Sequence, residues 1–186
     1  MTFIPNTMKM LVEYMRLKQP PMDFSVAGSA SPRFPSVIGY NLAGRRFHLP
    51  KDFGAKPTIA LIAFEEWQQN LVDTWLPHMD GLIQDYPHAQ YFELPTIYTM
   101  SPIGQATLDM WMRLGIPDRA ARERTITLYL SVESFLQTLR LPTNQQIYTL
   151  LLDATGTVRW QVAGPYATDK EASLRAALDV LTANGV

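Results

Sequence analysis

The chain has 186 residues, of which 47% are hydrophobic and 18% are charged, values typical of a single globular domain. Its 16 basic and 17 acidic side chains give a formal net charge of -1, which offers no electrostatic attraction for a nucleic-acid backbone. The sequence contains no cysteine, which excludes disulfides, thiolate metal sites and cysteine-based catalysis.

The histidines and the apolar segments predict neither a metal site nor a membrane span. His48, His78 and His88 lie far apart and lack HxxH or HExxH spacing. No run of about 18 apolar residues exists, as a membrane-spanning helix requires. Residues 8–17 lack the uninterrupted apolar centre of a secretory signal, because charged side chains interrupt them. We therefore expect a soluble, cytoplasmic protein without a metal or other cofactor.

The N-terminal part of the chain is expected to form an arm outside the main domain. Apolar side chains recur at helical spacing within residues 8–17, which predicts a short amphipathic helix. Two prolines end this helix, and residues 25–35, rich in Ser, Gly and Pro, predict a linker. The helix is expected to pack on the body of the protein, with a dimer arm or a membrane-surface anchor as alternatives. This divides the chain into an arm over residues 1–33 and a domain over residues 34–186.

The domain begins with a predicted hairpin and a buried strand. Residues 41–44 separate two β-prone runs within residues 37–49, which favours a hairpin. Residues 58–64 are apolar without a break, as is typical of a strand buried on both faces. Residues 66–83 then carry apolar side chains at helical intervals around Pro77, which predicts a helix kinked at this proline.

Strands and helices continue to alternate in the middle of the domain. Strands are predicted over residues 89–94 and 125–130, and helices over residues 103–114 and 131–139.

A hairpin and a helix are predicted to complete the domain. Residues 147–152 and 158–162 are β-prone, and the turn between them contains Gly156, which supplies the positive φ of a tight turn. Thr168 to Glu171 matches a capping box and predicts a last amphipathic helix. The order of elements predicts an α/β protein with a mixed central sheet flanked by helices.

Residues 62–77 run from the buried strand through a turn into the helix with Pro77. Together with the order of elements, this stretch resembles the thioredoxin-like superfamily. The resemblance places the two redox cysteines of that family at Gln69 and Val72, and its cis-proline at Ile147. Gln69 and Val72 form no disulfide, and no cis bond is expected at Ile147. The resemblance therefore implies a thioredoxin-like fold without thiol–disulfide activity.

A second, narrower resemblance rests on scattered motifs. They are Phe34-Pro35, Gly39-Tyr40-Asn41-Leu42, residues 69–77, and residues 151–160 with Gly164. These motifs are similar to those of the mitochondrial assembly-factor family that assists the membrane-sector proton-channel subunit of ATP synthase, a thioredoxin-like family without the redox pair. The resemblance implies an assembly role. Residues 1–33 fall outside it and contain no Arg-rich, acid-poor transit segment, which favours a bacterial-type relative.

The best candidate for a contact surface is the region that would house the reactive groups of a redox relative. Its residues belong to the predicted helix start and to the strand expected across from it: Glu65, Glu66, Trp67, Gln68, Gln69, Asn70, Val72, Ile147 and Tyr148. The same pattern also fits a structural role, because acidic residues favour helix starts and aromatic side chains cover cores.

Two further groups of residues have both a functional and a structural interpretation. The first is a charged link of Arg113, Asp118, Arg119, Arg122, Glu123 and Arg124. It could bind an anion, but the i,i+4 spacing of Asp118 and Arg122 favours a solvated face with salt bridges. The second group is Tyr91, Tyr98, Met100, Met110, Trp111 and Met112. It could accept an apolar helix of a partner, although core filling is the commoner use.

No catalytic pattern is present. A Ser-His-Asp order, a phosphate loop and a nucleotide fingerprint are all missing, so no reaction is assigned. The preferred hypothesis is a non-catalytic binding, assembly or chaperone-like factor for a protein partner, with peripheral membrane contact left open. The alternative is an enzyme or small-molecule carrier that uses other side chains in place of thiols: Glu65, Glu66, Gln69, Tyr98 or Arg124.

Overall fold

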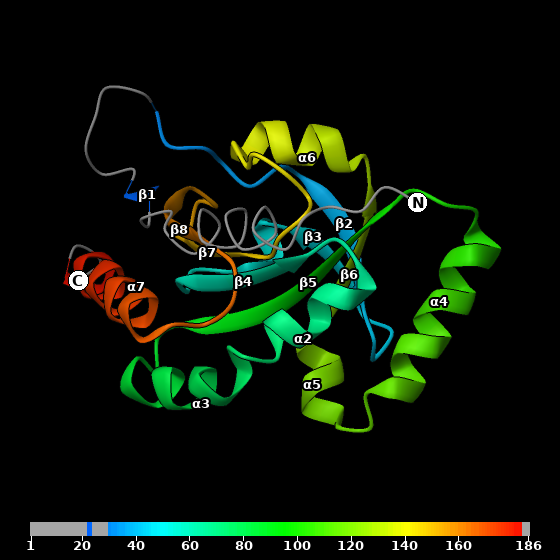
Figure 1. Ribbon diagram of the computed structural model, residues 1–186, viewed down its shortest axis with the longest axis horizontal. Coiled ribbons are helices and arrows are strands. Elements are labelled where there is room, and N and C mark those ends of the chain that lie inside the picture. Colours follow the sequence, from blue (N-terminus) through cyan, green and yellow to red (C-terminus); the bar gives the residue numbers. More distant parts are fainter. Residues whose placement is uncertain (1–21, 24–29, 184–186) are drawn as a thin grey trace, which may run out of the picture.

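A mixed sheet of eight strands forms the centre of the computed structural model, which describes residues 22–23 and 30–183 (Figure 1). The strand order is β1-β8-β7-β4-β5-β6-β2-β3. The strands are β1 (Met22–Asp23), β2 (Val37–Asn41), β3 (Arg46–Leu49), β4 (Thr58–Ala63), β5 (Gln90–Tyr98), β6 (Ile126–Leu130), β7 (Tyr148–Leu152) and β8 (Val158–Ala163). β5 is parallel to both β4 and β6, and the other pairs are antiparallel.

Helices lie on both sides of this sheet (Figure 1). They are the 3-10 turns η1 (Lys51–Phe53) and η2 (Glu66–Gln68) and the helices α2 (Gln69–Val72), α3 (Leu76–Asp85), α4 (Pro102–Gly115), α5 (Arg119–Arg124), α6 (Val132–Leu139) and α7 (Thr168–Ala183). The expected α/β architecture with a mixed sheet flanked by helices is therefore confirmed.

Each face of the sheet carries its own apolar core. On the face of α6, side chains from β4, β6 and β7 pack with Phe34, Phe47 and Phe135. On the face of α3 and α7, side chains from β4, β5, β7 and β8 pack with Trp75 and Leu174. Every residue of β4 is buried, because this strand is central and covered on both faces, as its unbroken apolar run predicts.

The helix predicted over residues 66–83 is not continuous, and the prediction of a single kinked helix is wrong in this respect. The chain forms η2 and α2, turns over residues 73–75, and starts α3 with Pro77 in its first turn. Proline lacks a backbone N–H and suits a first turn, where that donor has no partner within the helix. Pro77 therefore begins a second helix and does not bend the first.

Two other elements differ from their predicted extents. β5 continues four residues beyond the predicted end at residue 94, through Pro95, which lies opposite Ala63 at the end of β4. The charged link contains a helix, α5, which begins where the side chain of Asp118 accepts a hydrogen bond from the backbone N–H of Ala121 at 2.7 Å. Asp118 is therefore a helix cap and not the partner of Arg122.

The other predicted strands and helices of the domain are present, and two expectations about its start remain open. The helix predicted over residues 8–17 lies outside the described residues, and the boundary at residue 33 stays a prediction. The hairpin turn after β7 matches its prediction, with Gly156 at a φ of 79°. Glycine is needed here for two reasons. The positive φ favours it, and a Cβ at this position would lie 2.5 Å from Pro50 Cγ.

Candidate functional site

The region of interest begins where β4 ends and the chain turns into α2. The backbone N–H of Phe64 donates to the side-chain oxygen of Gln68 at 2.8 Å, and Gln68 Nε2 donates to the carbonyl of Asn144 at 2.7 Å. Gln68 is fully buried. Its amide therefore links the end of β4 to the loop that precedes β7, and supplies the partner that the buried N–H of Phe64 would otherwise lack.

The residues around this buried link are exposed. Glu65, Glu66 and Asn70 face solvent, and Trp67 keeps 49% of its surface exposed. A tryptophan this open in the turn between a central strand and its helix does not serve the core. The turn therefore presents an aromatic ring flanked by carboxylates.

The neighbouring strand β5 brings a second aromatic residue to the same edge of the sheet, and helix α6 brings a third acidic residue. Because β4, β5 and β6 are parallel, their carboxyl ends lie at one edge. Tyr98, the last residue of β5, donates its hydroxyl to Glu133 Oε1 in the first turn of α6 at 2.8 Å. This bond raises the pKa of Tyr98, and the nearby charge of Glu65 raises it further. The hydroxyl is therefore a donor held in place by a carboxylate.

We call this set of exposed side chains the carboxyl-end surface. It consists of Glu65, Glu66, Trp67, Asn70, Tyr98 and Glu133. Glu133 was not among the predicted site residues. Its position follows from the parallel pairing of β5 and β6, which the local sequence does not reveal.

Four of the nine residues predicted for the contact surface are buried, so the prediction is wrong for them. Gln68, Val72, Ile147 and Tyr148 are each at most 2% exposed. Val72 and Ile147 pack in the core under α3 and α7, whereas Tyr148 packs on the opposite face of the sheet. The hydroxyl of Tyr148 donates to the carbonyl of Thr143 at 2.8 Å. These residues support the fold beneath the edge and offer no atoms to a partner.

Gln69, where the resemblance places the first redox cysteine, covers a buried carboxyl group. Gln69 Nε2 donates to Glu93 Oε2 at 3.3 Å and to Asp73 Oδ1 at 2.9 Å. Glu93 is 5% exposed, and burial raises the pKa of its carboxyl group. Arg124 exerts a weaker, opposite effect on this pKa. A carboxylate and an arginine thus approach each other here, but Glu93 is too buried to meet a ligand without movement of α2.

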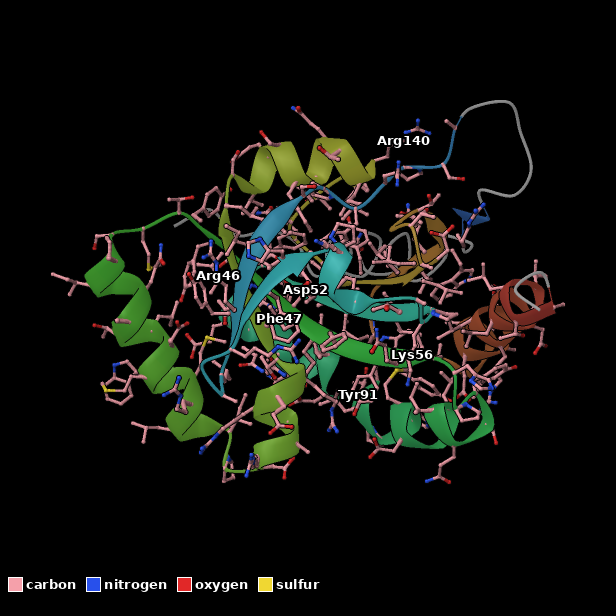
Figure 2. All side chains as sticks on the ribbon, turned by 180° about the vertical axis from the view of Figure 1, so that it is seen from behind. Arg46, Phe47, Asp52, Lys56, Tyr91 and Arg140 are labelled. Carbon is pink, nitrogen blue, oxygen red and sulfur yellow. The ribbon has the colours of Figure 1, made fainter. Side chains whose placement is uncertain are left out.

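Arg124 also contacts an aromatic ring on the same face of the sheet. Its guanidinium carbon lies 4.8 Å from the centroid of Tyr91, which Figure 2 labels on β5. Burial raises the pKa of Tyr91 to about 12, and its hydroxyl donates to Asp80 at 3.1 Å. Arg124 is therefore not part of a solvated face, as the sequence suggested, but half-buried against the sheet.

The predicted group of aromatic and methionine residues does not form one cluster. Tyr91 is buried in the core, whereas Tyr98, Met110 and Trp111 are exposed. The interpretation of Met110 and Trp111 as core filling is wrong, because α4 contains no buried residue.

Neither a metal centre nor a membrane span is found in the part of the chain that the structure describes. Over residues 22–23 and 30–183, no group of three or more His, Cys, Asp or Glu side chains could hold a metal ion. Within the same ranges, no helix is long and apolar enough to cross a bilayer.

Comparisons with known proteins identify the fold. No family model and no curated protein matches the sequence. Among solved structures, the chain is similar to a proposed electron transport protein from Aquifex aeolicus VF5, with a TM-score of 0.57, 13% identity, and coverage of 81% of this chain and 96% of that one. It is also similar to BsSco, a member of the Sco family of cytochrome c oxidase assembly proteins, with a TM-score of 0.54, 12% identity, and coverage of 83% and 98%.

A third similar structure is the thioredoxin domain of a thiol-disulfide oxidoreductase from Bacteroides vulgatus, with a TM-score of 0.50, 14% identity, and coverage of 82% and 99%. Identities this low show the fold alone. They confirm the thioredoxin-like architecture that the sequence predicts, in a chain without cysteine.

Proposed function

Because the chain has a thioredoxin-like fold and no cysteine, we propose that it is a non-catalytic binding, assembly or chaperone-like factor for a protein partner. The observation that carries this proposal is the exposure of Trp67 at the turn where redox relatives hold their reactive groups. Gln69 and Val72 replace the two cysteines there with an amide and a buried aliphatic group. The carboxyl-end surface thus keeps an exposed edge while the thiol chemistry is gone.

The composition of the carboxyl-end surface supports a particular kind of partner. Trp67 and Tyr98 provide two exposed aromatic rings of the type that dominates binding energy in interfaces. Glu65, Glu66 and Glu133 surround them with negative charge, which favours positive groups on the other side. The partner that fits best is a polypeptide segment with apolar and basic side chains.

The assembly role is the finer part of the proposal. It is supported by the sequence resemblance to the assembly-factor family of ATP synthase. BsSco, which shares the fold, is a member of the Sco family of cytochrome c oxidase assembly proteins. An assembly factor needs a surface that holds a subunit and then releases it, and a modest, partly charged surface suits such transient binding.

The absence of cysteine makes the surface directly testable, because one introduced cysteine is the only thiol in the protein. Glu66→Cys places a photocrosslinker on the carboxyl-end surface. Lys56→Cys is the matched control, since Lys56 is also exposed but precedes β4 and so lies at the opposite end of that strand (Figure 2). In host extract, the probe at position 66 is expected to form a discrete protein adduct that the probe at position 56 does not form.

Two outcomes would contradict the proposal. Adducts that persist unchanged after Trp67→Ala and Glu65→Gln are added to Glu66→Cys would show that the surface does not select the partner. Disulfide reductase or peroxidase turnover by the unmodified chain would show a catalytic function that needs no cysteine of its own.

A further inference from the structure

Helix α4 presents a row of large apolar side chains to solvent. Ile103, Met110, Trp111 and Leu114 are 81%, 52%, 64% and 69% exposed, respectively. At about 100° per residue, Ile103, Met110 and Leu114 fall within about 40° of one another on the helix surface. With the smaller residues between them they form the outer stripe, which consists of Ile103, Ala106, Thr107, Met110, Trp111 and Leu114.

The opposite face of α4 is the one that holds the helix to the fold. Leu108 and Met112 are half-buried there. Tyr129 of β6 donates its hydroxyl to Asp109 Oδ1 at 2.7 Å and approaches the carbonyl of Gln105 at 3.3 Å. The outer stripe therefore points away from the sheet, and Figure 2 shows side chains of α4 projecting outward at the margin of the molecule. The helix is therefore apolar on two faces, and only one of them packs against the rest of the fold.

The geometry points to a second copy of this chain as the occupant of the outer stripe, with the two α4 helices packed antiparallel. A two-fold axis midway between residues 108 and 109 places Ile103 opposite Leu114 of the partner subunit. It also places Trp111 against the partner's Thr107, and Met110 against the partner's Ala106. Trp111 and Met110 thus meet small side chains near the centre of the pair, while Ile103 and Leu114 make an apolar contact at each end, a size pattern that lets two helices pack closely.

The charges on α4 are compatible with this pairing. The outer stripe contains no charged residue, and Asp109 lies on the other face, where it accepts the bond from Tyr129. Arg113 lies at the margin of the stripe. The two copies of Arg113 would be about 13 Å apart along the helix axes, which is more than a Debye length at physiological salt. Pairing of the two α4 helices therefore brings no like charges of α4 together.

Two other occupants fit the stripe less well. A membrane-surface helix attracts anionic lipid through several Lys or Arg residues on its polar face, whereas Arg113 is the one basic residue of α4. A helix of an unrelated partner fits less well, because it would leave the match between two copies of the stripe without an explanation. The pair of 14-residue helices is short, with a length of about 21 Å each. A contact confined to helices of this length is expected to bury less than the ~800 Å² per partner of a standard interface, so the dimer is expected to dissociate at micromolar concentrations.

Sedimentation velocity over a range of protein concentrations tests the dimer. The unmodified chain is expected to shift from monomer to dimer mass across the micromolar range. Leu114→Glu should remain monomeric at every concentration, because it places two charges in the apolar contact. Ile38→Glu is the matched control, since Ile38 is an exposed apolar residue of β2, outside α4, and should dimerise like the unmodified chain.

Single cysteines in this cysteine-free chain test the orientation. In the antiparallel pair, the two copies of residue 107 lie about 4.5 Å apart along the helix axes, and the two copies of residue 103 about 16 Å apart. Thr107→Cys should therefore form a disulfide-linked dimer on mild oxidation, and Ile103→Cys should not.

Three results would overturn the inference. The first is a monomer at all concentrations, as expected if residues 8–17 of the same chain cover the stripe. The second is crosslinking of Ile103→Cys but not of Thr107→Cys, which indicates parallel helices. The third is binding to vesicles of anionic phospholipid that Leu114→Glu abolishes, with no dimer in their absence. The inference does not depend on the proposed function, because the outer stripe shares no residue with the carboxyl-end surface.

Discussion

Helices α7 and α4 have similar lengths and both carry apolar stripes, yet the fold treats them differently. α7 buries Leu174 and Leu178 completely, and its Lys170 Nζ donates to the carbonyls of Ala163 and Pro165, both at 2.8 Å. α4 has no buried residue, and one tyrosine hydroxyl, that of Tyr129, bonds it to the sheet through Asp109 and the carbonyl of Gln105. Periodicity therefore predicts that a helix forms, but the surface that receives its apolar face depends on the rest of the fold.

Polar contacts add to the difference between the two helices. Arg175 of α7 donates to Glu171 at 2.8 Å and to Asp85 of α3 at 2.7 Å. The hydroxyl of Tyr166 donates to Glu171 at 2.7 Å, and its ring stacks on His78 of α3 at 3.6 Å between centroids. This group joins α7, α3 and the loop between β8 and α7. α7 is thus a fixed part of the fold, and α4 is an attached element whose outer face is available.

The largest expected difference comes from truncating one leucine in each helix. Leu174→Ala should lower the free energy of unfolding by about 2–5 kcal/mol, because it leaves a cavity in the core under α7. Leu114→Ala should change it by less than about 0.5 kcal/mol in dilute protein, because the side chain is exposed. Urea unfolding followed by far-UV circular dichroism measures both values. Equal losses would show that α4 is packed as tightly as α7.

The packed elements could be predicted from the sequence, whereas the burial of individual residues near the exposed turn could not, and the reason is physical. The stripe that contains Leu174, the unbroken run of β4 and the Gly156 turn are each specified by residues close together in the chain. By contrast, the burial of Gln68 depends on a loop far away in sequence, near Asn144. An amide at a helix start is typical of a surface, so the local pattern indicated the opposite of what the fold requires.

The same limit applies to the ionic contacts and to the site. The sequence predicts a capping box at Thr168, but the carboxylate of Glu171 accepts bonds from Tyr166 and Arg175 instead. The exposed residues Glu65, Glu66 and Trp67 lie in a turn that local sequence identifies. Glu133 joins them through strand pairing, which involves residues too far apart in sequence for a local pattern.

A second test uses Glu93 of β5, whose buried carboxyl group interacts with Gln69 of α2 and Arg124 of α5. Burial raises the pKa of this carboxyl group above its unfolded value, so its ionisation opposes folding as the pH rises through the interval between the two values. Glu93→Gln should therefore be more stable than the unmodified chain at pH 7, by about 1.4 kcal/mol for each pKa unit of the shift. The gain should disappear below the unfolded pKa of about 4.3.

Urea unfolding at several pH values between 4 and 8 follows this gain. Asp73→Asn is the control for loss of a nearby exposed carboxylate. A gain for Glu93→Gln that does not vary with pH would contradict an origin in the ionisation of Glu93.

A third test compares the ion pair of Glu171 in α7 with that of Glu123 in α5. The hydrogen bond from Tyr166, followed by the contact with Arg175, lowers the pKa of Glu171, so its ionised form stabilises the fold above the unfolded pKa. This stabilisation is lost as the pH falls through the lower, folded value. Glu171→Gln should cost about 1 kcal/mol at pH 7 and less in acid. Glu123→Gln removes the more exposed pair with Arg119 in α5 and should cost less than about 0.5 kcal/mol. Equal costs would show that the ion pair of α7 stabilises the fold no more than the exposed pair of α5.

The most local expected effect concerns the attachment of α4 itself. Tyr129→Phe removes the hydroxyl that bonds Asp109, while its ring stays in place. Burial, followed by the bond to Asp109, raises the pKa of Tyr129, so the hydroxyl remains a donor throughout the accessible pH range. Its loss should cost at most about 1 kcal/mol and should act locally, because few other contacts hold the helix.

Hydrogen exchange resolves this local effect. Amides of α4 should exchange several-fold faster in Tyr129→Phe, while those of α7 should keep their rates, since about 1.4 kcal/mol corresponds to a tenfold change. Tyr98→Phe is the matched control, because it removes a hydroxyl bond to Glu133 and leaves α4 untouched. If the amides of α7 accelerated together with those of α4, the two helices would open as one cooperative unit, and α4 could not present its outer face independently of the core.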